Sequence, residues 1–423
     1  MFRYVLVFAV LAGCVTEEAA PSTSTAEEAS SLAFSRERVV GDIYHYSLVI
    51  PLGTGTNRSV RVHRVVREIA PFVPRPSANA ALLMHGDFAT FETNFAPTLG
   101  DPVSPATGLA PYLASRGVDV WGIDRRWTLP GAAGDVSDFG TMGVAQDLDD
   151  VRAVLAFARA FRLAGGSGGG KLALIGFSHG AQLAYAYASV EATRPVALRH
   201  IDALVPLDYY GELGPDQAAL KQAACDNSAA GYEWVAQGFI DSPNDFQITA
   251  GQLAQNAPND PSPLIEGLTN RDVMLQLVGK TYQFAPLAPL YHLLAPTLTG
   301  GEPTGLTETT ETAANAWLAG SPPHESFLEA VDFDALICGQ APPVSAPLSR
   351  ITVPVFYIGA AGGVGDLGLY STTRVSSTDV RTLVLRRFGP ERRGEDVGHA
   401  DLLYAASARR LAWEPLAAWL AAH

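Results

Sequence analysis

Ser178 is the residue whose type and surroundings best fit nucleophilic chemistry. It stands in a Gly-Phe-Ser-His-Gly pattern that runs from Gly176 to Gly180, shortly after the apolar run Leu172–Ile175. Glycine on either side allows a sharp turn from a strand into a helix, which holds the serine hydroxyl out above the strand ends. The start of the following helix favours negative charge that develops nearby. We therefore expect Ser178 to act as a nucleophile.

A serine hydroxyl becomes a good nucleophile only when a base takes its proton, and a histidine base needs a carboxylate to orient it. His399 lies in a polar loop before the C-terminal helix, from which it could reach back to Ser178. Asp366 follows the penultimate predicted strand and gives the chain order Ser, Asp, His. We expect Asp366 to be the acid. Asp208, which directly follows another apolar run, is the alternative.

Backbone N–H groups close to the nucleophile could stabilise an oxyanion. His85 and Gly86 follow the apolar run Ala80–Met84, and Gly86 allows the chain to approach another backbone closely. We expect the donors to be the amides of Asp87 and His179. We predict a structural role for the ring of His85 and no role for the ring of His179.

The elements that must position these residues are short apolar runs separated by amphipathic stretches. These runs predict strands at Tyr44–Ile50, Ser59–Ile69, Ala80–Met84, Val118–Ile123, Leu172–Ile175, Ile201–Leu207, Val353–Ile358 and Arg381–Leu385. Strands that alternate with helices indicate a mostly parallel sheet covered by helices on both faces. The alternation stops between residues 209 and 349, which are rich in aromatic residues, proline and glycine. We interpret this interval as a helical cap, with an unrelated second domain as the alternative.

Taken together, these motifs resemble those of the α/β-hydrolase fold, and in particular of its serine esterases and lipases. The resemblance covers most of residues 44–423 outside the 209–349 interval, and its motifs follow the family order: His85–Asp87, Leu113–Asp124, Gly176–Gly180 and Gly398–Asp401. It implies an eight-stranded, mostly parallel sheet flanked by helices, with a large helical cap inserted after the sixth strand. It also implies a core formed by residues 39–208 and 350–423 around a cap formed by residues 209–349.

The activity that the resemblance implies is hydrolysis of a carboxylic ester through an acyl-enzyme intermediate on Ser178. Amidase, peptidase, thioesterase and lipase activities on the same fold are alternatives. A non-catalytic ligand-binding lipoprotein is the alternative from another class. The aromatic residues of the 209–349 interval favour a small or medium-sized ester with an apolar group. No cofactor is expected, and the scattered histidines predict no metal site.

The N-terminal residues resemble a bacterial lipoprotein signal. A positive charge precedes the apolar run Val5–Ala12, and small residues lead to Cys14. The resemblance implies removal of residues 1–13, a lipid on Cys14, a flexible tether over residues 14–38, and a place in the bacterial cell envelope, facing the periplasm or at the cell surface. Secretion without a lipid is the alternative. The apolar run is too short to span a bilayer, so we expect no transmembrane helix.

The charge balance of the sequence excludes one class of partner. The 423 residues carry 29 Lys and Arg against 43 Asp and Glu, a net charge of −14, and include no basic block. Such a chain does not neutralise phosphates, so we expect no nucleic-acid partner.

In an exported protein Cys225 and Cys338 could form a disulfide, or else be two small buried apolar side chains. Nothing in the sequence indicates the oligomeric state.

Overall fold

The computed structural model describes residues 33–54, 56–97, 108–285, 287–340 and 346–423. The expected signal segment, Cys14 and the expected tether up to residue 32 lie outside the described residues. In the described ranges, no helix is both long enough and apolar enough to cross a membrane.

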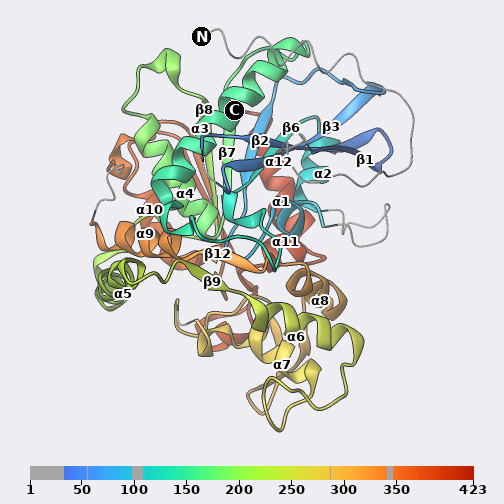
Figure 1. Cartoon of the computed structure of the whole chain (residues 1–423), viewed down its shortest axis with the longest axis vertical. Coiled ribbons are helices and arrows are strands. Elements are labelled where there is room, and N and C mark those ends of the chain that lie inside the picture. The colour runs from blue at the N-terminus through green and yellow to red at the C-terminus, as the bar shows by residue number, and fades with distance from the viewer. Residues whose placement is uncertain (1–32, 55, 98–107, 286, 341–345) are drawn as a thin grey trace, which may run out of the picture. The chain divides into compact units, whose positions relative to one another are not determined.

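A ten-stranded sheet forms the centre of residues 33–423 (Figure 1). Its strands are β1 (Phe34–Val40), β2 (Ile43–Pro51), β3 (Ser59–Ala70), β4 (Val73–Pro74), β5 (Ala80–Met84), β6 (Asp119–Asp124), β7 (Leu172–Phe177), β8 (Ile201–Leu207), β13 (Val355–Ala360) and β14 (Val380–Leu385). Their order across the sheet is β1-β2-β3-β6-β5-β7-β8-β13-β14, and β4 pairs with β3. The strands from β1 through β3 to β6 pair antiparallel, and those from β6 to β14 pair parallel.

The predicted strands are all present, within a few residues of their predicted ends, and the mostly parallel sheet is confirmed. The expected number of strands is too low, because β1 and the short β4 were not predicted. Since β1 begins at Phe34, the expected tether is wrong for residues 34–38. β1 lies at the edge of the sheet, where charged side chains are common and obscure the apolar alternation. Arg36, for example, forms an ion pair with Glu68 of β3.

Helices cover both faces of the sheet. They are α1 (Phe91–Phe95), α2 (Leu109–Ser115), α3 (Val144–Ala164), α4 (His179–Glu191), α10 (Gly365–Thr372), α11 (Asp401–Tyr404) and α12 (Glu414–Leu420). Leu82 of β5 belongs to an apolar cluster with α3 and α4, and its neighbour Leu83 to a second cluster with α2 and α12. Because successive strand residues point to opposite faces, the two clusters lie on opposite sides of the sheet.

Residues 209–349 are inserted between β8 and β13. The helices of this insertion are α5 (Ala218–Ala236), α6 (Asp245–Asn256), α7 (Asn270–Gly279), α8 (Glu311–Ala319) and α9 (Phe327–Cys338). Two small antiparallel pairs join β9 (Asp241–Pro243) to β12 (His324–Ser326) and β10 (Pro296–Thr299) to β11 (Glu302–Leu306). Helices α6, α7 and α8 are grouped at the bottom of Figure 1, and α5 packs along α9. The insertion is therefore mainly helical, as expected, with short strand pairs in addition.

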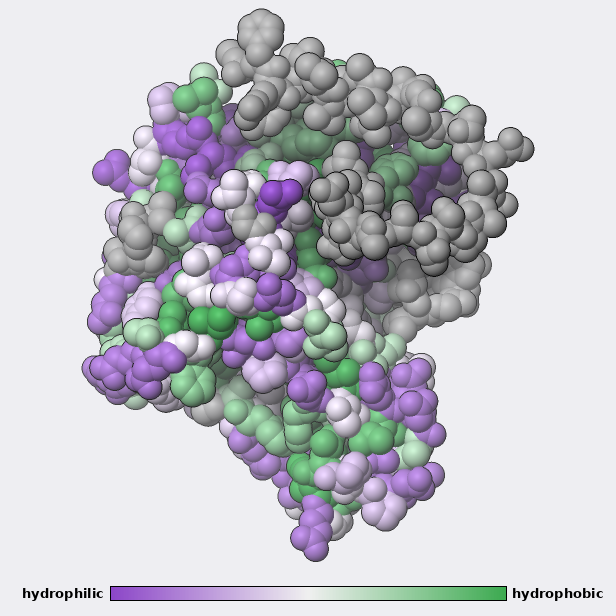
Figure 2. Space-filling model, viewed as in Figure 1, coloured by the Kyte–Doolittle hydropathy of each residue, from purple (hydrophilic) through white to green (hydrophobic). Residues whose placement is uncertain are grey.

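The group formed by α6, α7 and α8 exposes apolar side chains among polar ones (Figure 2). Phe246 of α6 is 38% exposed and Phe284 is 45% exposed, with their ring centroids 6.0 Å apart. Two rings form a small patch, and single exposed apolar side chains are normal on protein surfaces.

A disulfide joins Cys225 of α5 to Cys338 of α9, so of the two alternatives for these cysteines the structure contains the bonded one. The bond closes a loop with a sequence separation of 113 residues. A crosslink across a long loop stabilises the folded state mainly by reducing the conformational entropy of the unfolded chain.

We expect the double variant Cys225→Ser, Cys338→Ser to lower the free energy of unfolding by about 2–4 kcal/mol. Urea unfolding followed by circular dichroism, with and without dithiothreitol, would measure this loss. Reductant should shift the midpoint of the wild-type protein and leave that of the double variant unchanged. Equal midpoints for oxidised wild type and variant would contradict the prediction.

Candidate active site

Ser178 lies in a strained turn between β7 and α4. Its backbone angles are φ 58° and ψ −131°, a conformation that residues other than glycine rarely adopt. A Cβ atom at Gly176 would lie 2.0 Å from the carbonyl oxygen of Gly180, and a Cβ at Gly180 would lie 2.3 Å from that of Met84. Both glycines are therefore required by close backbone contacts, and the turn has the geometry expected from the sequence.

The His-Gly turn after β5 lies directly against the serine. A Cβ atom at Gly86 would come within 2.8 Å of the Cβ of Ser178, so glycine is needed at this position as well. Asp87 follows Gly86, and His179 follows Ser178. In the described part of the chain, the backbone N–H groups of Asp87 and His179 donate no hydrogen bond. Two unpaired N–H groups beside the hydroxyl are what an oxyanion site requires.

His85, by contrast, is buried and serves the turn itself. Its Nδ1 atom lies 2.8 Å from the carbonyl oxygen of Gly86, and a guanidinium nitrogen of Arg125 donates to that same oxygen at 2.8 Å. Burial and the positive charge of Arg125 lower the pKa of His85 to about 3, so its ring is neutral near pH 7. These contacts fit the expected structural role.

His399 forms a buried hydrogen bond with Asp208. The His399 Nδ1 atom lies 2.7 Å from Oδ2 of Asp208, and the two residues are 2% and 0% exposed. The imidazole stacks on Phe177, the residue before the serine, with ring centroids 4.6 Å apart. The backbone N–H of Ser178 in turn donates to the carbonyl oxygen of Leu207, the residue before Asp208, at 3.0 Å. Ser178, His399 and Asp208 are thus gathered at the carboxyl ends of β7 and β8.

The bond between His399 and Asp208 uses Nδ1, and Nε2 of the imidazole has no hydrogen-bond partner among the described residues. Among the hydrogen bonds of the described residues, none joins Ser178 to His399 directly. In enzymes, hydrogen bonds between catalytic side chains are often long without substrate and tighten only when substrate binds.

The structure corrects the expected acid. Asp366 lies in the first turn of α10 with a side chain 39% exposed, and it pairs with Arg386 at 2.6 Å and with Arg393 at 3.5 Å. It has no contact with His399. Asp208, the alternative, occupies the place predicted for Asp366.

The last residue of β13 and the glycine-rich loop after it hold the carboxylate of Asp208. The backbone N–H groups of Ala360 and Val364 donate to the two carboxylate oxygens of Asp208 at 2.7 and 3.2 Å. A Cβ atom at Gly363 would lie 1.9 Å from Oδ2 of Asp208. Glycine is needed here because the loop wraps around the carboxylate. The sequence signal that points to Asp208 is its position. It is a polar residue directly after β8, the strand that pairs with β7, which leads to Ser178.

The 209–349 insertion holds the loop that carries His399. The backbone N–H of His399 donates to the carbonyl oxygen of His292 at 3.0 Å, and that of Ala400 donates to Leu293 at 2.8 Å. The ring of Tyr291 lies 5.6 Å from that of His399. His399 is therefore positioned by the core through Asp208 and by the insertion through backbone hydrogen bonds.

The ring of His179, to which the sequence assigns no role, is held between two polar groups. Its Nδ1 atom contacts the carboxylate of Asp87, and its Nε2 atom lies 2.9 Å from the hydroxyl oxygen of Tyr209. Glu325 of β12 lies beside them, and its Oε2 atom accepts a hydrogen bond from the backbone N–H of Phe88 at 3.3 Å. Burial, and then the nearby carboxylates of Asp87 and Glu329, raise the pKa of Glu325 well above its usual range. Sequence reasoning could not place Glu325 here, since β12 lies far along the chain in the insertion.

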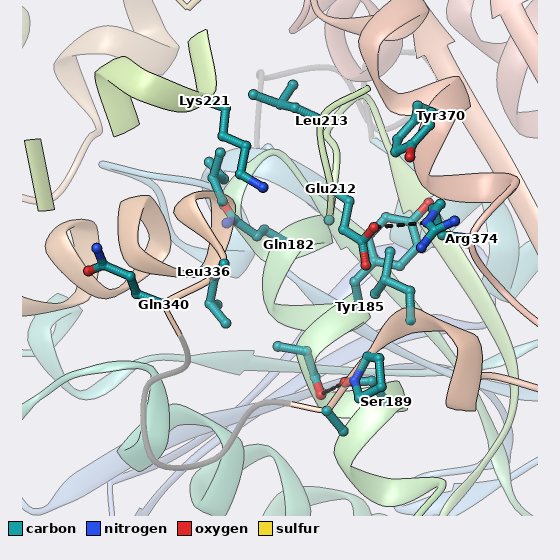
Figure 3. A pocket seen from close by; sticks show the side chains of 17 residues that line it. Gln182, Tyr185, Ser189, Glu212, Leu213, Lys221, Leu336, Gln340, Tyr370 and Arg374 are labelled. Atoms are coloured by element: carbon teal, nitrogen blue, oxygen red, sulfur yellow. Dashed lines mark hydrogen bonds and ion pairs between the residues drawn. The ribbon is translucent and has the colours of Figure 1, made fainter. Parts of the chain in front are cut away.

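A cavity of about 450 Å³ runs along another face of α4 (Figure 3). Gln182, Tyr185 and Ser189 of this helix line it, and Arg374 and Glu212 form an ion pair at its edge. Ser178, Asp208 and His399 do not line this cavity. It is therefore separate from the candidate active site.

Neither a protein-family model nor a curated protein sequence matches the chain. Among solved structures, the chain is similar to a candidate lipase from Sulfolobus solfataricus, with 15% identity, a TM-score of 0.62, and coverage of 92% of this chain and 99% of that one. A soluble variant of the monoglyceride lipase of Saccharomyces cerevisiae matches with 13% identity and a TM-score of 0.44, over 95% of this chain and 98% of the other. Esterase E22 matches with 12% identity and a TM-score of 0.43, over 89% and 100%.

Identities this low bear on the fold alone. The order and direction of the strands, the strained serine turn after β7 and the likeness to the Sulfolobus structure agree with one another. The chain has the α/β-hydrolase fold.

Proposed function

We propose that the protein is a serine hydrolase that cleaves a carboxylic ester through an acyl-enzyme, with Ser178, His399 and Asp208 as its catalytic triad. The observation that carries the proposal is the buried hydrogen bond between His399 and Asp208 beside the strained turn of Ser178. A histidine held by a carboxylate close to a partly buried serine is the arrangement that activates a hydroxyl.

In the proposed mechanism, the Nδ1–H group of His399 donates to Asp208, so the Nε2 lone pair faces the serine. Nε2 takes the proton of Ser178 as Oγ attacks the ester carbonyl carbon. The amides of Asp87 and His179 stabilise the oxyanion, a contribution of about 10²–10³ in rate for each donor in comparable sites. The imidazolium then protonates the departing alcohol oxygen. Water, deprotonated by His399, releases the acid and restores the serine.

Aromatic side chains of the insertion support an apolar group in the substrate. Tyr291 packs beside His399, and the ring of Phe333 lies 4.6 Å from that of His179. Trp234 and Phe239 of the insertion are 52% and 62% exposed and do not enclose such a group. An amide or a thioester is the alternative substrate for the same triad, and ligand binding without catalysis is the alternative function.

We also propose that the protein is anchored in the bacterial cell envelope through a lipid on Cys14. The support for this proposal is the short apolar run, followed by small residues and a cysteine, near the start of the sequence.

The first prediction concerns the nucleophile. A fluorophosphonate probe should label the wild-type protein on Ser178 and leave Ser178→Ala unlabelled, while ester turnover falls about 10⁴-fold or more because the attacking oxygen is lost. Mass spectrometry of the labelled peptide and p-nitrophenyl ester assays would measure both effects. A folded wild-type protein that takes no label would favour the binding role. A set of matched esters, amides and thioesters would then separate the enzyme alternatives.

The second prediction concerns the acid. Asp208→Asn should lower kcat about 10³–10⁴-fold, because the amide no longer holds the required imidazole tautomer. Asp366→Asn is the matched control and should change kcat by less than about threefold, since exposed ion pairs such as that of Asp366 with Arg386 contribute little. Steady-state assays of both variants, with thermal unfolding as a check on folding, would measure this. A larger loss in Asp366→Asn would reverse the assignment.

The third prediction concerns the anchor. In a bacterial host, an alkyne-tagged fatty acid should label the wild-type chain, because the thiol of Cys14 would carry the lipid. The wild-type chain should also be found in the membrane pellet after fractionation. Cys14→Ser should lose the label and move to the soluble fraction, with Cys225→Ser as the control that keeps both. Labelling of Cys14→Ser at the wild-type level would contradict the anchor.

A further inference from the structure

A second polar cluster lies beside Ser178, and the side chains that form it have no part in the proposed hydrolysis. It consists of Asp87 after β5, His179 at the start of α4 and Glu325 in β12. One oxygen or nitrogen atom of each side chain lies within 4.8 Å of the others. We call these residues the Asp87 cluster.

The contact between Asp87 and His179 brings two electron-pair donors together. The hydroxyl of Tyr209 lies 2.9 Å from Nε2 of His179 and can accept the Nε2–H hydrogen bond. In that tautomer the lone pair of Nδ1 faces the carboxylate oxygen of Asp87. Two such lone pairs repel each other unless a positive charge, a proton or a metal ion, lies between them. Tyr209 thus orients the ring as groups behind metal-binding histidines commonly do.

Glu325 supplies an independent observation. Its side chain is 3% exposed and faces the carboxylate of Asp87, and its Oε1 atom accepts no hydrogen bond from any described residue. Two carboxylates that face each other repel unless a positive charge, a proton or a metal ion, lies between them. Arg125 does not fill this place, because its guanidinium pairs with Glu329.

The cluster is open on one side. The side chains of Asp87 and His179 are 31% and 16% exposed, so an ion can reach them from solvent, whereas Glu325 closes the buried side. One imidazole and two carboxylates match the ligand preferences of Zn²⁺ and its neighbours, with a further position left for water.

We propose that Asp87, His179 and Glu325 bind a divalent transition-metal ion of the Zn²⁺ type on the oxyanion side of Ser178. The sequence predicts no such site, because its ligands come from the two core loops and from the distant insertion. The proposal does not depend on hydrolytic activity, since it rests on the ligand atoms alone.

A second group of potential ligands, His45, His63 and Glu92, fits an ion less well. Nε2 of His45 lies 2.9 Å from Nδ1 of His63, and Nε2 of His63 lies 3.0 Å from a carboxylate oxygen of Asp124. The nitrogens of His63 are therefore occupied, and only Nδ1 of His45 faces Glu92, at 3.9 Å. This group provides a matched control.

The test is metal binding by the full-length chain after treatment with EDTA and dialysis. Isothermal titration with Zn²⁺, and the visible absorption of added Co²⁺, should show one ion per chain. Glu325→Gln and His179→Gln should each weaken Zn²⁺ binding at least about 100-fold, because each removes a ligand. Tyr209→Phe should weaken it about tenfold, because it removes only the hydrogen bond that orients His179. His45→Gln should bind as the wild type does.

Three results would overturn the proposal. They are no binding by the wild type at about 1 mM Zn²⁺, equal affinity in Glu325→Gln, or loss of binding in His45→Gln alone. Circular dichroism would verify that each variant is folded, and Asp87→Asn would replace any variant that is not. Since the readout is binding, the result is independent of whether Ser178 proves to be a nucleophile.

Discussion

The hydrogen bond between His399 and Asp208 is the interaction on which the arrangement of the candidate site depends. It connects the end of β8 to the loop before α11, two places separated in sequence by the whole insertion and by two further strands. The carboxylate of Asp208 is held for this bond by two backbone N–H groups, one from Ala360 at the end of β13 and one from Val364 in the loop that follows. A buried carboxylate with fewer donors would be costly. The position of Asp208 therefore depends both on the sheet and on the glycine-rich loop.

Local features of the chain were predictable wherever one strand and its next few residues determine the structure. The apolar runs predicted the strands, and the glycines around Ser178 predicted a turn that close backbone contacts require. The acid was misassigned because the sequence shows that the loop after β13 is flexible enough to bend, but not which residue it bends around. β1 was missed because an edge strand rich in charge lacks the apolar alternation of an inner one.

Contacts between the core and the insertion could not be predicted from sequence patterns. The backbone N–H of Phe88 and the carboxylate of Glu325 are separated by 237 residues, and Arg125 and Glu329 by 204. No periodicity or spacing encodes such pairs, since each depends on how two separately folded segments pack. The ring of His179 illustrates the result. The Gly-Phe-Ser-His-Gly pattern accounts for its backbone, whereas its side chain takes its role from Asp87 and Tyr209.

The hydrogen bonds from His399 and Ala400 to His292 and Leu293 limit how the insertion can move. If the insertion moved away as one rigid piece, the loop that carries His399 would lose these two hydrogen bonds. In the proposed mechanism, such a movement would displace the base from its position beside the serine. The irregular segment of residues 291–293 must therefore stay in place during the proposed turnover, even if other parts of the insertion move.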